Sequence, residues 1–260
     1  MNHAFTIDGR KVPFAEGQTV LQAALADGVY IPHLCAHPEF KPHGSCRVCT
    51  VKVNGHHAAS CTLVAQDGLQ VESETEEVRE LRRELVQMLF VEGNHFCMSC
   101  EKSGNCELQA LGYRYGITAP RLEFQFPVCG VDASHPDILI DHNRCILCAR
   151  CVRTSQDLDG KGVFGFVGRG PHKRLAVSSG ARLADTDADI TDQALDACPV
   201  GALLRKRVGF ATPVGRRLYD REPIGTGIDR AGAAMAPTAR PTAGQSEAAG
   251  QAAPATKEPR

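Results

Sequence analysis

Cysteine is the residue type that stands out in this chain, with 12 copies among 260 residues. Eleven of them fall into three groups whose spacing is typical of metal-binding segments. The first group is Cys35, Cys46, Cys49 and Cys61; the second is Cys97, Cys100 and Cys106; the third is Cys145, Cys148, Cys151 and Cys198. Thiolates bind zinc and iron–sulfur clusters. Metal binding is therefore the chemistry that the sequence offers first.

The first group predicts a 2Fe-2S cluster. The pair Cys46-x-x-Cys49 lets two neighbouring thiolates reach one iron, while the loops that end at Cys35 and Cys61 supply the other. A structural zinc site is the alternative, because zinc also binds four cysteines. Zinc sites usually contain two short Cys-x-x-Cys pairs and this group contains one, which favours the iron–sulfur interpretation.

The second group has three cysteines, so one iron of a 4Fe-4S cluster lacks a thiolate. His95, two residues before Cys97, is the predicted fourth ligand. A neutral imidazole in place of a thiolate removes one negative charge and raises the reduction potential. The alternative is that His95 is a surface residue or supports another ligand. Cys129 is the rival fourth ligand, but it follows two prolines in a different segment, and we expect it to be a buried or reactive free thiol without a cluster role.

The third group has the spacing of a bacterial ferredoxin, in which three closely spaced cysteines and a distant Cys-Pro bind one 4Fe-4S cluster. Cys198-Pro199 supplies the distant member. A two-cluster ferredoxin would have a cysteine where Ser155 stands, and a second triplet before Cys198 that this chain lacks. The group therefore predicts a single 4Fe-4S cluster, with four zinc-bound thiolates as the alternative.

Turn and capping signals predict the elements that hold the first group. Asp8-Gly9 and Asn54-Gly55 are pairs that two-residue hairpin turns prefer. Thr19 with Gln22 forms a capping box at the start of a helix. The expected elements are strands at 4–7 and 11–14, a helix from 19 to 28, strands at 50–53 and 57–61, and a closing strand at 69–72. Together they predict a β-grasp-like domain over residues 1–74.

A change to helical period at Ser73 predicts a second domain over residues 75–120. Ser73 with Glu76 resembles a capping box. The expected apolar face of the helix is formed by Val78, Leu81, Leu85 and Met88. This helix leads into the second cysteine group.

The third cysteine group lies in a predicted ferredoxin-like domain over residues 135–207. Its glycine-rich stretch, 160–170, opens no helix, so we interpret it as turns and a strand near a cluster rather than a phosphate-binding loop. The whole chain is thus expected to be α+β. Residues 208–224 are predicted to be a docking arm. Residues 225–260 are rich in proline, alanine and glycine without an aromatic residue, and are predicted to be disordered.

Charge and hydropathy exclude several partners. Lys and Arg total 29 against 30 Asp and Glu, so the chain lacks the basic excess that nucleic-acid binding needs. It has no apolar run long enough for membrane insertion and no signal-peptide pattern, so we expect a cytoplasmic protein. Dinucleotide-binding, Walker and catalytic-triad motifs are missing from the sequence. Three clusters without a substrate-converting site predict an electron carrier.

The order of these motifs, with Glu92-Gly93-Asn94-His95-Phe96-Cys97 in its middle, resembles the N-terminal part of the large iron–sulfur subunit of respiratory complex I. It is most similar to a shorter relative, the small diaphorase iron–sulfur subunit of the soluble NAD-reducing nickel–iron hydrogenases. The similarity covers about residues 3–220. In complex I the histidine stands four residues before the first cysteine of its trio, where this chain has Gly93.

The resemblance implies that the chain is an iron–sulfur subunit of an enzyme that reduces NAD with hydrogen. It implies one 2Fe-2S and two 4Fe-4S clusters in this chain, FMN and NAD on a flavin-binding diaphorase subunit, and nickel–iron hydrogenase small and large subunits as further partners. The segment 215–219 is similar to the family's docking arm, with a solvated basic stretch as the alternative. Rival functions are an iron–sulfur subunit of an NAD-linked formate dehydrogenase or of a complex I-like NADH oxidoreductase, and a zinc-stabilised scaffold without redox activity.

Overall fold

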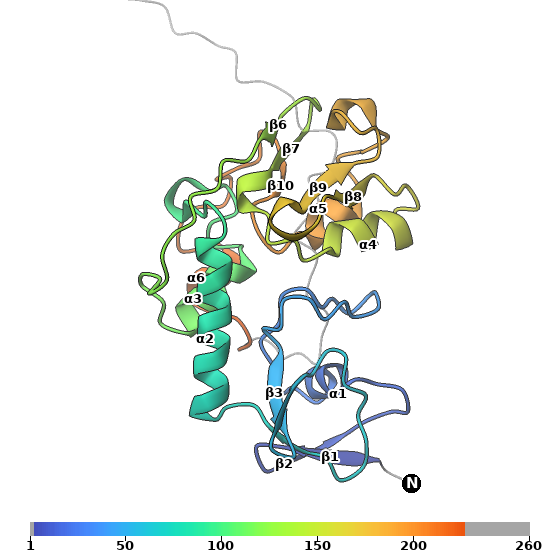
Figure 1. The fold of residues 1–260 in the computed structure, drawn as a ribbon, viewed down its shortest axis with the longest axis vertical. Coiled ribbons are helices and arrows are strands. Elements are labelled where there is room, and N and C mark those ends of the chain that lie inside the picture. Colours follow the sequence, from blue (N-terminus) through green and yellow to red (C-terminus); the bar gives the residue numbers. More distant parts are fainter. Residues whose placement is uncertain (1–2, 227–260) are drawn as a thin grey trace, which may run out of the picture.

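A computed structural model describes residues 3–226 of the chain. The N-terminal part is a five-stranded sheet in the order β2-β1-β5-β3-β4, with helix α1 against it (Figure 1). Strands β1 and β5 pair in parallel and the other pairs are antiparallel. The elements are β1 (Ala4–Ile7), β2 (Arg10–Pro13), α1 (Val20–Ala26), β3 (Thr50–Val53), β4 (His56–Ala59) and β5 (Gln70–Glu72). The predicted β-grasp-like arrangement is confirmed.

Local signals in the sequence explain this part well. Asp8 and Gly9 have φ of 48° and 82°, and Asn54 and Gly55 have φ of 48° and 85°. Two successive residues with positive φ make the turn that suits the twist of a tight hairpin. At α1, the Gln22 amide donates to the Thr19 hydroxyl and the Thr19 amide donates to the Gln22 side chain, at 3.2 Å and 2.9 Å. The predicted capping box is therefore present.

Helix α2 (Glu76–Val91) begins differently from the prediction. Its N-cap is Thr75, whose hydroxyl accepts from the Val78 amide, and the expected capping box of Ser73 with Glu76 is wrong. Ser73 is buried, and its hydroxyl and carbonyl oxygens accept from the guanidinium of Arg82, which also donates to the Thr50 carbonyl. This fully buried arginine ties α2 to the N-terminal sheet. The expected apolar face is also wrong in part, because Met88 is 45% exposed.

Helix α2 runs along one side of the molecule to the two remaining cysteine groups (Figure 1). The second group lies on η1 (Cys97–Ser99) and at the start of α3 (Glu107–Arg114). The third group lies among two small sheets, β10-β7-β6 and β8-β9. Their elements are β6 (Val131–Asp132), β7 (Ile138–Asp141), η2 (His142–Arg144), α4 (Arg150–Asp157), β8 (Phe164–Val167), η3 (Gly170–His172), β9 (Arg174–Val177), η4 (Leu183–Asp185), α5 (Gln193–Ala197) and β10 (Leu203–Arg205).

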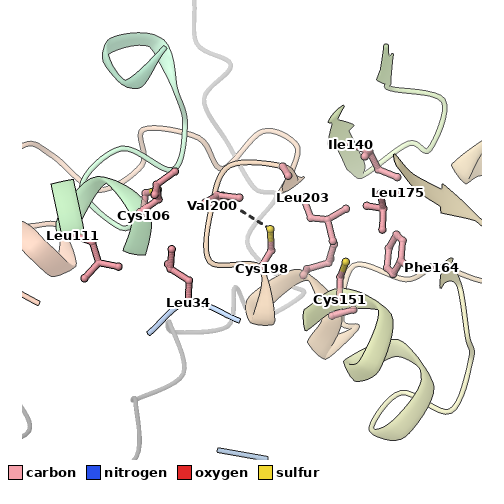
Figure 2. Packing of buried hydrophobic residues seen from close by; sticks show 14 of the residues in the cluster. Leu34, Cys106, Leu111, Ile140, Cys151, Phe164, Leu175, Cys198, Val200 and Leu203 are labelled. Carbon is pink, nitrogen blue, oxygen red and sulfur yellow. Dashed lines mark hydrogen bonds between the residues drawn. The ribbon is translucent and has the colours of Figure 1, made fainter. Parts of the chain in front are cut away.

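The buried side chains form two cores. One lies inside the N-terminal domain, and the other joins the second and third cysteine groups in one packed region (Figure 2). The second core also contains Leu34 and Val48, which come from the cysteine-bearing loops of the N-terminal domain. The loops that carry the first group are therefore packed against the region that carries the other two.

Residues 208–226 begin exposed and end packed on their own chain. Phe210 and Val214 are exposed, whereas the amides of Leu218 and Tyr219 on α6 (Leu218–Arg221) donate to Asn105 and Gly104 in the second group's loop. The end of the arm therefore contacts its own chain. The predicted tail of 225–260 lies almost wholly outside the described residues. Within the described part of the chain, no helix has the length and apolar character needed to cross a bilayer.

Candidate metal centres

The sulfurs of the first group converge at one end of the N-terminal domain. Cys35, Cys49 and Cys61 are about 1% exposed, and the Cys35 amide donates to the sulfur of Cys46 at 3.4 Å. Hydrogen bonds with the thiols of Cys46 and Cys61 lower the pKa of Cys35, and a hydrogen bond with Cys61 lowers the pKa of Cys49 to about 7. The structure thus brings all four predicted ligands together, with hydrogen bonds between their side chains.

The loops between closely spaced cysteines have an unusual backbone. Arg47 lies between Cys46 and Cys49 with φ of 60°, while Leu147 and Ala149 lie between the cysteines of the third group with φ of 52° and 60°. Side chains other than glycine rarely adopt this left-handed region. Alternating right- and left-handed residues turn successive amides toward one side, which forms the concave anion-binding loop found at iron–sulfur sites. These strained residues fit a bound cluster.

The four cysteines of the third group line a single cavity. Its lining consists of the cysteines and apolar residues: Ile146, Leu147, Ala149, Phe166, Leu175, Val200, Ala202 and Leu203. Phe166 comes from the glycine-rich stretch, which forms turns and strand β8 as predicted. Ser155, where a second-cluster cysteine would stand, is buried, and its hydroxyl accepts from the Val163 amide at 2.9 Å.

Burial raises the pKa of Cys145, Cys148 and Cys151 and keeps these three thiols protonated when no metal is bound. It raises the pKa of Cys145 to about 11 and of Cys148 to about 12. Metal ligation requires thiolates, so binding at this site must release protons. The fold positions the thiols in surroundings of low polarity. The positive charge of the metal would then favour the loss of their protons.

The second group forms a cavity that His95 also lines. Its lining is more polar than that of the third cavity: Phe90, His95, Cys97, Cys100, Ser103, Cys106, Leu108, Gln109, Arg144 and Gly201. The Arg144 guanidinium donates to the Cys100 sulfur at 3.5 Å and to Glu101 at 2.7 Å. The structure thus brings the four predicted residues of this group together and adds a cation beside one sulfur.

The imidazole of His95 has the features of a metal ligand. Its Nε2 atom is buried and has no protein partner. Burial lowers the pKa of the ring to about 4, so the imidazole is neutral, and the ring hydrogen-bonds to the Leu89 carbonyl. Since a carbonyl only accepts, the proton is on Nδ1 and the lone pair of Nε2 is free. A ligating histidine commonly donates its other ring N–H to a backbone carbonyl in this way.

Cys129, the rival fourth ligand, is exposed, so of the two predicted kinds of free thiol, buried or reactive, the structure excludes the buried one. Its backbone amide and carbonyl hydrogen-bond to the side chain of Asn143 at 3.0 Å each. It does not line the cavity of the second group.

The turn after Cys198 is a wall shared by the second and third cavities. Val200 lines the third cavity and Gly201 lines the second. A Cβ atom on Gly201 would lie 2.6 Å from the sulfur of Cys100, so only glycine fits there. Figure 2 shows Cys198 and Val200 between Cys106 and Cys151.

Sequence reasoning missed the roles of Arg144 and Gly201. Arg144 directly precedes Cys145, and Gly201 is three residues after Cys198. The only signal in the sequence was that each residue lies close to a cysteine of the third group. In the structure, both residues line the cavity of the second group instead.

Within residues 3–226, no three His, Cys, Asp or Glu side chains are arranged closely enough to hold a single metal ion. The donors of the second group and those of the third group instead each line a cavity.

Comparison with family models divides the chain into three cluster-binding regions. Residues 3–76 match a 2Fe-2S iron–sulfur cluster binding domain. Residues 82–121 match the NADH-ubiquinone oxidoreductase-G iron–sulfur binding region. Residues 135–204 match the ferredoxin-like domain of NADH-quinone oxidoreductase subunit 3. The chain therefore contains 2Fe-2S and 4Fe-4S binding domains, and its predicted fold class is confirmed.

Whole-chain comparisons find relatives of two lengths. The chain is 42% identical to the gamma subunit of the NAD-reducing hydrogenase HoxS of Cupriavidus necator, over 86% of this chain and 96% of that one. It is 34% identical to the mitochondrial NADH-ubiquinone oxidoreductase 78 kDa subunit of Candida albicans, over 79% of this chain but 29% of that one. A chain of a crystal structure of an NAD⁺-reducing nickel–iron hydrogenase in the hydrogen-reduced state is 54% identical, with a TM-score of 0.82 over 85% of this chain and 94% of that one.

Proposed function

The chain belongs to the family of iron–sulfur subunits that includes the gamma subunit of the NAD-reducing hydrogenase HoxS, and from this premise we propose that it carries electrons between the hydrogen-oxidising and NAD-reducing parts of such an enzyme. The partners would be a diaphorase subunit that binds FMN and NAD(H), and the small and large subunits of a nickel–iron hydrogenase. The assembly would work in the cytoplasm. No substrate would be converted in this chain itself.

The observation that carries the proposal is that each predicted ligand set converges on one place. The cysteines of the third group line one cavity, and His95 lines another with the cysteines of the second group. We assign a 2Fe-2S cluster to the first group and a 4Fe-4S cluster to each of the others. When bound, such clusters accept and release single electrons. The chain's own residues hold the sulfurs, exclude water and set the charge around each site.

The three sites are continuous within the protein. The Glu107 amide, next to Cys106, donates to the carbonyl of Pro199, next to Cys198, at 2.9 Å. The Arg153 guanidinium donates to the carbonyls of Cys35 and Cys148, at 2.6 Å and 3.4 Å. The third group is therefore in contact with both of the others. Short steps suit electron transfer, because the rate of tunnelling falls steeply with distance.

The test is hydrogen-dependent NAD reduction by the native complex, captured anaerobically through a tag on this chain. We expect brown material whose visible absorption bleaches on reduction and whose hydrogen-driven activity follows the tag. A colourless, zinc-containing preparation would contradict the electron-transfer role. A brown preparation that oxidises NADH but does not respond to hydrogen would contradict the hydrogenase assignment, and reduction by formate or quinone would then identify the other partner.

A further inference from the structure

Helix α4 lies where the three cysteine groups meet. It contributes Cys151 to the third cavity, and two of its arginines, Arg150 and Arg153, extend away from that cavity to the other groups. The two are three residues apart, so they lie one turn apart on the helix.

Arg150 joins the third group to the second. Its side chain is 1% exposed and makes two parallel hydrogen bonds to the carboxylate of Glu107, at 2.7 Å and 2.8 Å. Arg150 lies between two cysteines of the third group, whereas Glu107 directly follows Cys106 of the second. The ion pair is therefore buried between the second and third groups.

Arg153 joins the third group to the first. Its guanidinium donates to the carbonyls of Cys35 and Lys41, at 2.6 Å each, and lies over the ring of Phe40 at 4.3 Å from its centre. One planar group thus holds the loop that begins at Cys35. The contact to the Cys148 carbonyl, at 3.4 Å, returns to the third group.

Burying an ion pair such as Arg150–Glu107 adds little to the stability of a fold. Removing two charges from water costs several kcal/mol each, and apolar residues of similar volume are often as stabilising. The planar guanidinium group instead fixes geometry, because it can donate two parallel hydrogen bonds only to acceptors in a few orientations. An arrangement of three electron carriers benefits from fixed separations.

We propose that Arg150 and Arg153 are positioning residues for electron transfer: they fix the second and first cluster-binding segments, respectively, relative to the third. The inference rests on the proposed assignment of clusters to the three groups. The proposal assigns Arg150 to the separation between the second and third clusters and Arg153 to the separation between the first and third. The two roles can therefore be tested separately.

The experiment measures spin–spin interaction between reduced clusters, by electron paramagnetic resonance on the intact complex purified through a tag and reduced with dithionite. In Arg153→Met we expect the interaction between first and third clusters to change, while that between second and third stays as in the wild type. In the double variant Arg150→Met/Glu107→Leu, which leaves no unpaired buried charge, we expect the reverse. Iron content should remain at the wild-type level in both.

The matched control is Arg182→Met. Arg182 belongs to the same domain and pairs with Asp185 at 2.8 Å, but it is exposed and its partner is three residues away. This variant should alter neither interaction. Unchanged interactions in both test variants with full iron would overturn the proposal, as would an equal change in the control.

If Arg153→Met loses iron, Arg153→Lys is decisive, because it keeps the charge but cannot hold both carbonyls in one plane. The proposal requires full iron and an altered first-to-third interaction in that variant. General loss of iron from all three sites would overturn the proposal, since Arg153 would then serve folding alone. Absence of cluster signals from the wild-type complex would instead contradict the proposed function.

Discussion

The second and third cavities are both lined by cysteines and share a wall, yet their linings differ in kind. The third is enclosed by apolar side chains. The second contains a histidine, a glutamine and an arginine, and the residues on either side of Cys97, Phe96 and Met98, are 69% and 89% exposed. Two sites for the same kind of cluster are thus placed in different electrostatic surroundings.

This difference predicts different reduction potentials. A neutral imidazole ligand and a nearby cation both favour the more negative, reduced cluster, while an apolar lining disfavours it. We therefore expect the second cluster to have the higher potential. Ligand charge and lining polarity would set the order in which the two clusters are reduced.

The largest effect is expected from Cys148→Ser, which removes a ligand of the third cluster. The cluster should be lost or severely depleted, and hydrogen-driven NAD reduction should fall to background, because the third site connects the other two. Iron analysis and electron paramagnetic resonance on the tagged complex would show this. Retention of full activity would contradict both the relay and the central place of the third site.

His95→Cys should remove most of the difference between the two cavities. A fourth thiolate adds one negative charge, so the potential of the second cluster should fall, by on the order of 100 mV. A redox titration followed by electron paramagnetic resonance would measure both clusters in one sample, with the third as internal reference. An unchanged potential for the second cluster would mean that His95 is not a ligand.

Arg144→Gln should have a smaller effect in the same direction. The guanidinium is 3.5 Å from the sulfur of Cys100 but is paired with Glu101 and Asp141, so part of its charge is already balanced. We expect a downward shift of tens of mV, roughly, for the second cluster alone. The matched control is Arg205→Gln, which removes an ion pair with Asp196 elsewhere in the third domain. A shift in the third cluster would contradict the local effect.

Ser155→Ala should have the smallest effect and should not alter either potential. The substitution leaves the buried Val163 amide without its acceptor, which should lower the free energy of unfolding by about 1–2 kcal/mol. Thermal denaturation would measure the loss, and a redox titration would test the unchanged potentials. A potential shift would imply that this hydroxyl influences the third cluster directly.

Sequence patterns predicted most of the fold where structure is decided locally. The turns at Asp8-Gly9 and Asn54-Gly55 and the capping box at Thr19 are present because neighbouring residues alone determine them. The start of α2 was predicted wrongly at Ser73. The hydroxyl of Ser73 accepts a hydrogen bond from Arg82, which lies nine residues later in α2, and so does not cap the helix. Local rules fail where a buried partner competes for the same group.

The same contrast holds for the candidate sites. Cysteine spacing predicted each ligand set, and the structure places the members of each set together, although binding itself stays a prediction. Arg144 and Gly201 could not be assigned to the second site from spacing, because they belong to segments around the third group and reach the second only through tertiary packing.

The sequence by itself predicted which sulfurs belong together, because most ligands of one predicted centre lie on short loops, and the distant Cys198 is marked by the proline that follows it. Only the tertiary structure decided how the three groups are arranged. It brought the third group into contact with both others, joined the second and third across the turn from Cys198 to Gly201, and buried the Arg150–Glu107 pair that links those two. Those relations depend on contacts between residues that are far apart in the sequence, and no local pattern encodes them. Arg150 and Glu107, for example, are separated by 43 positions.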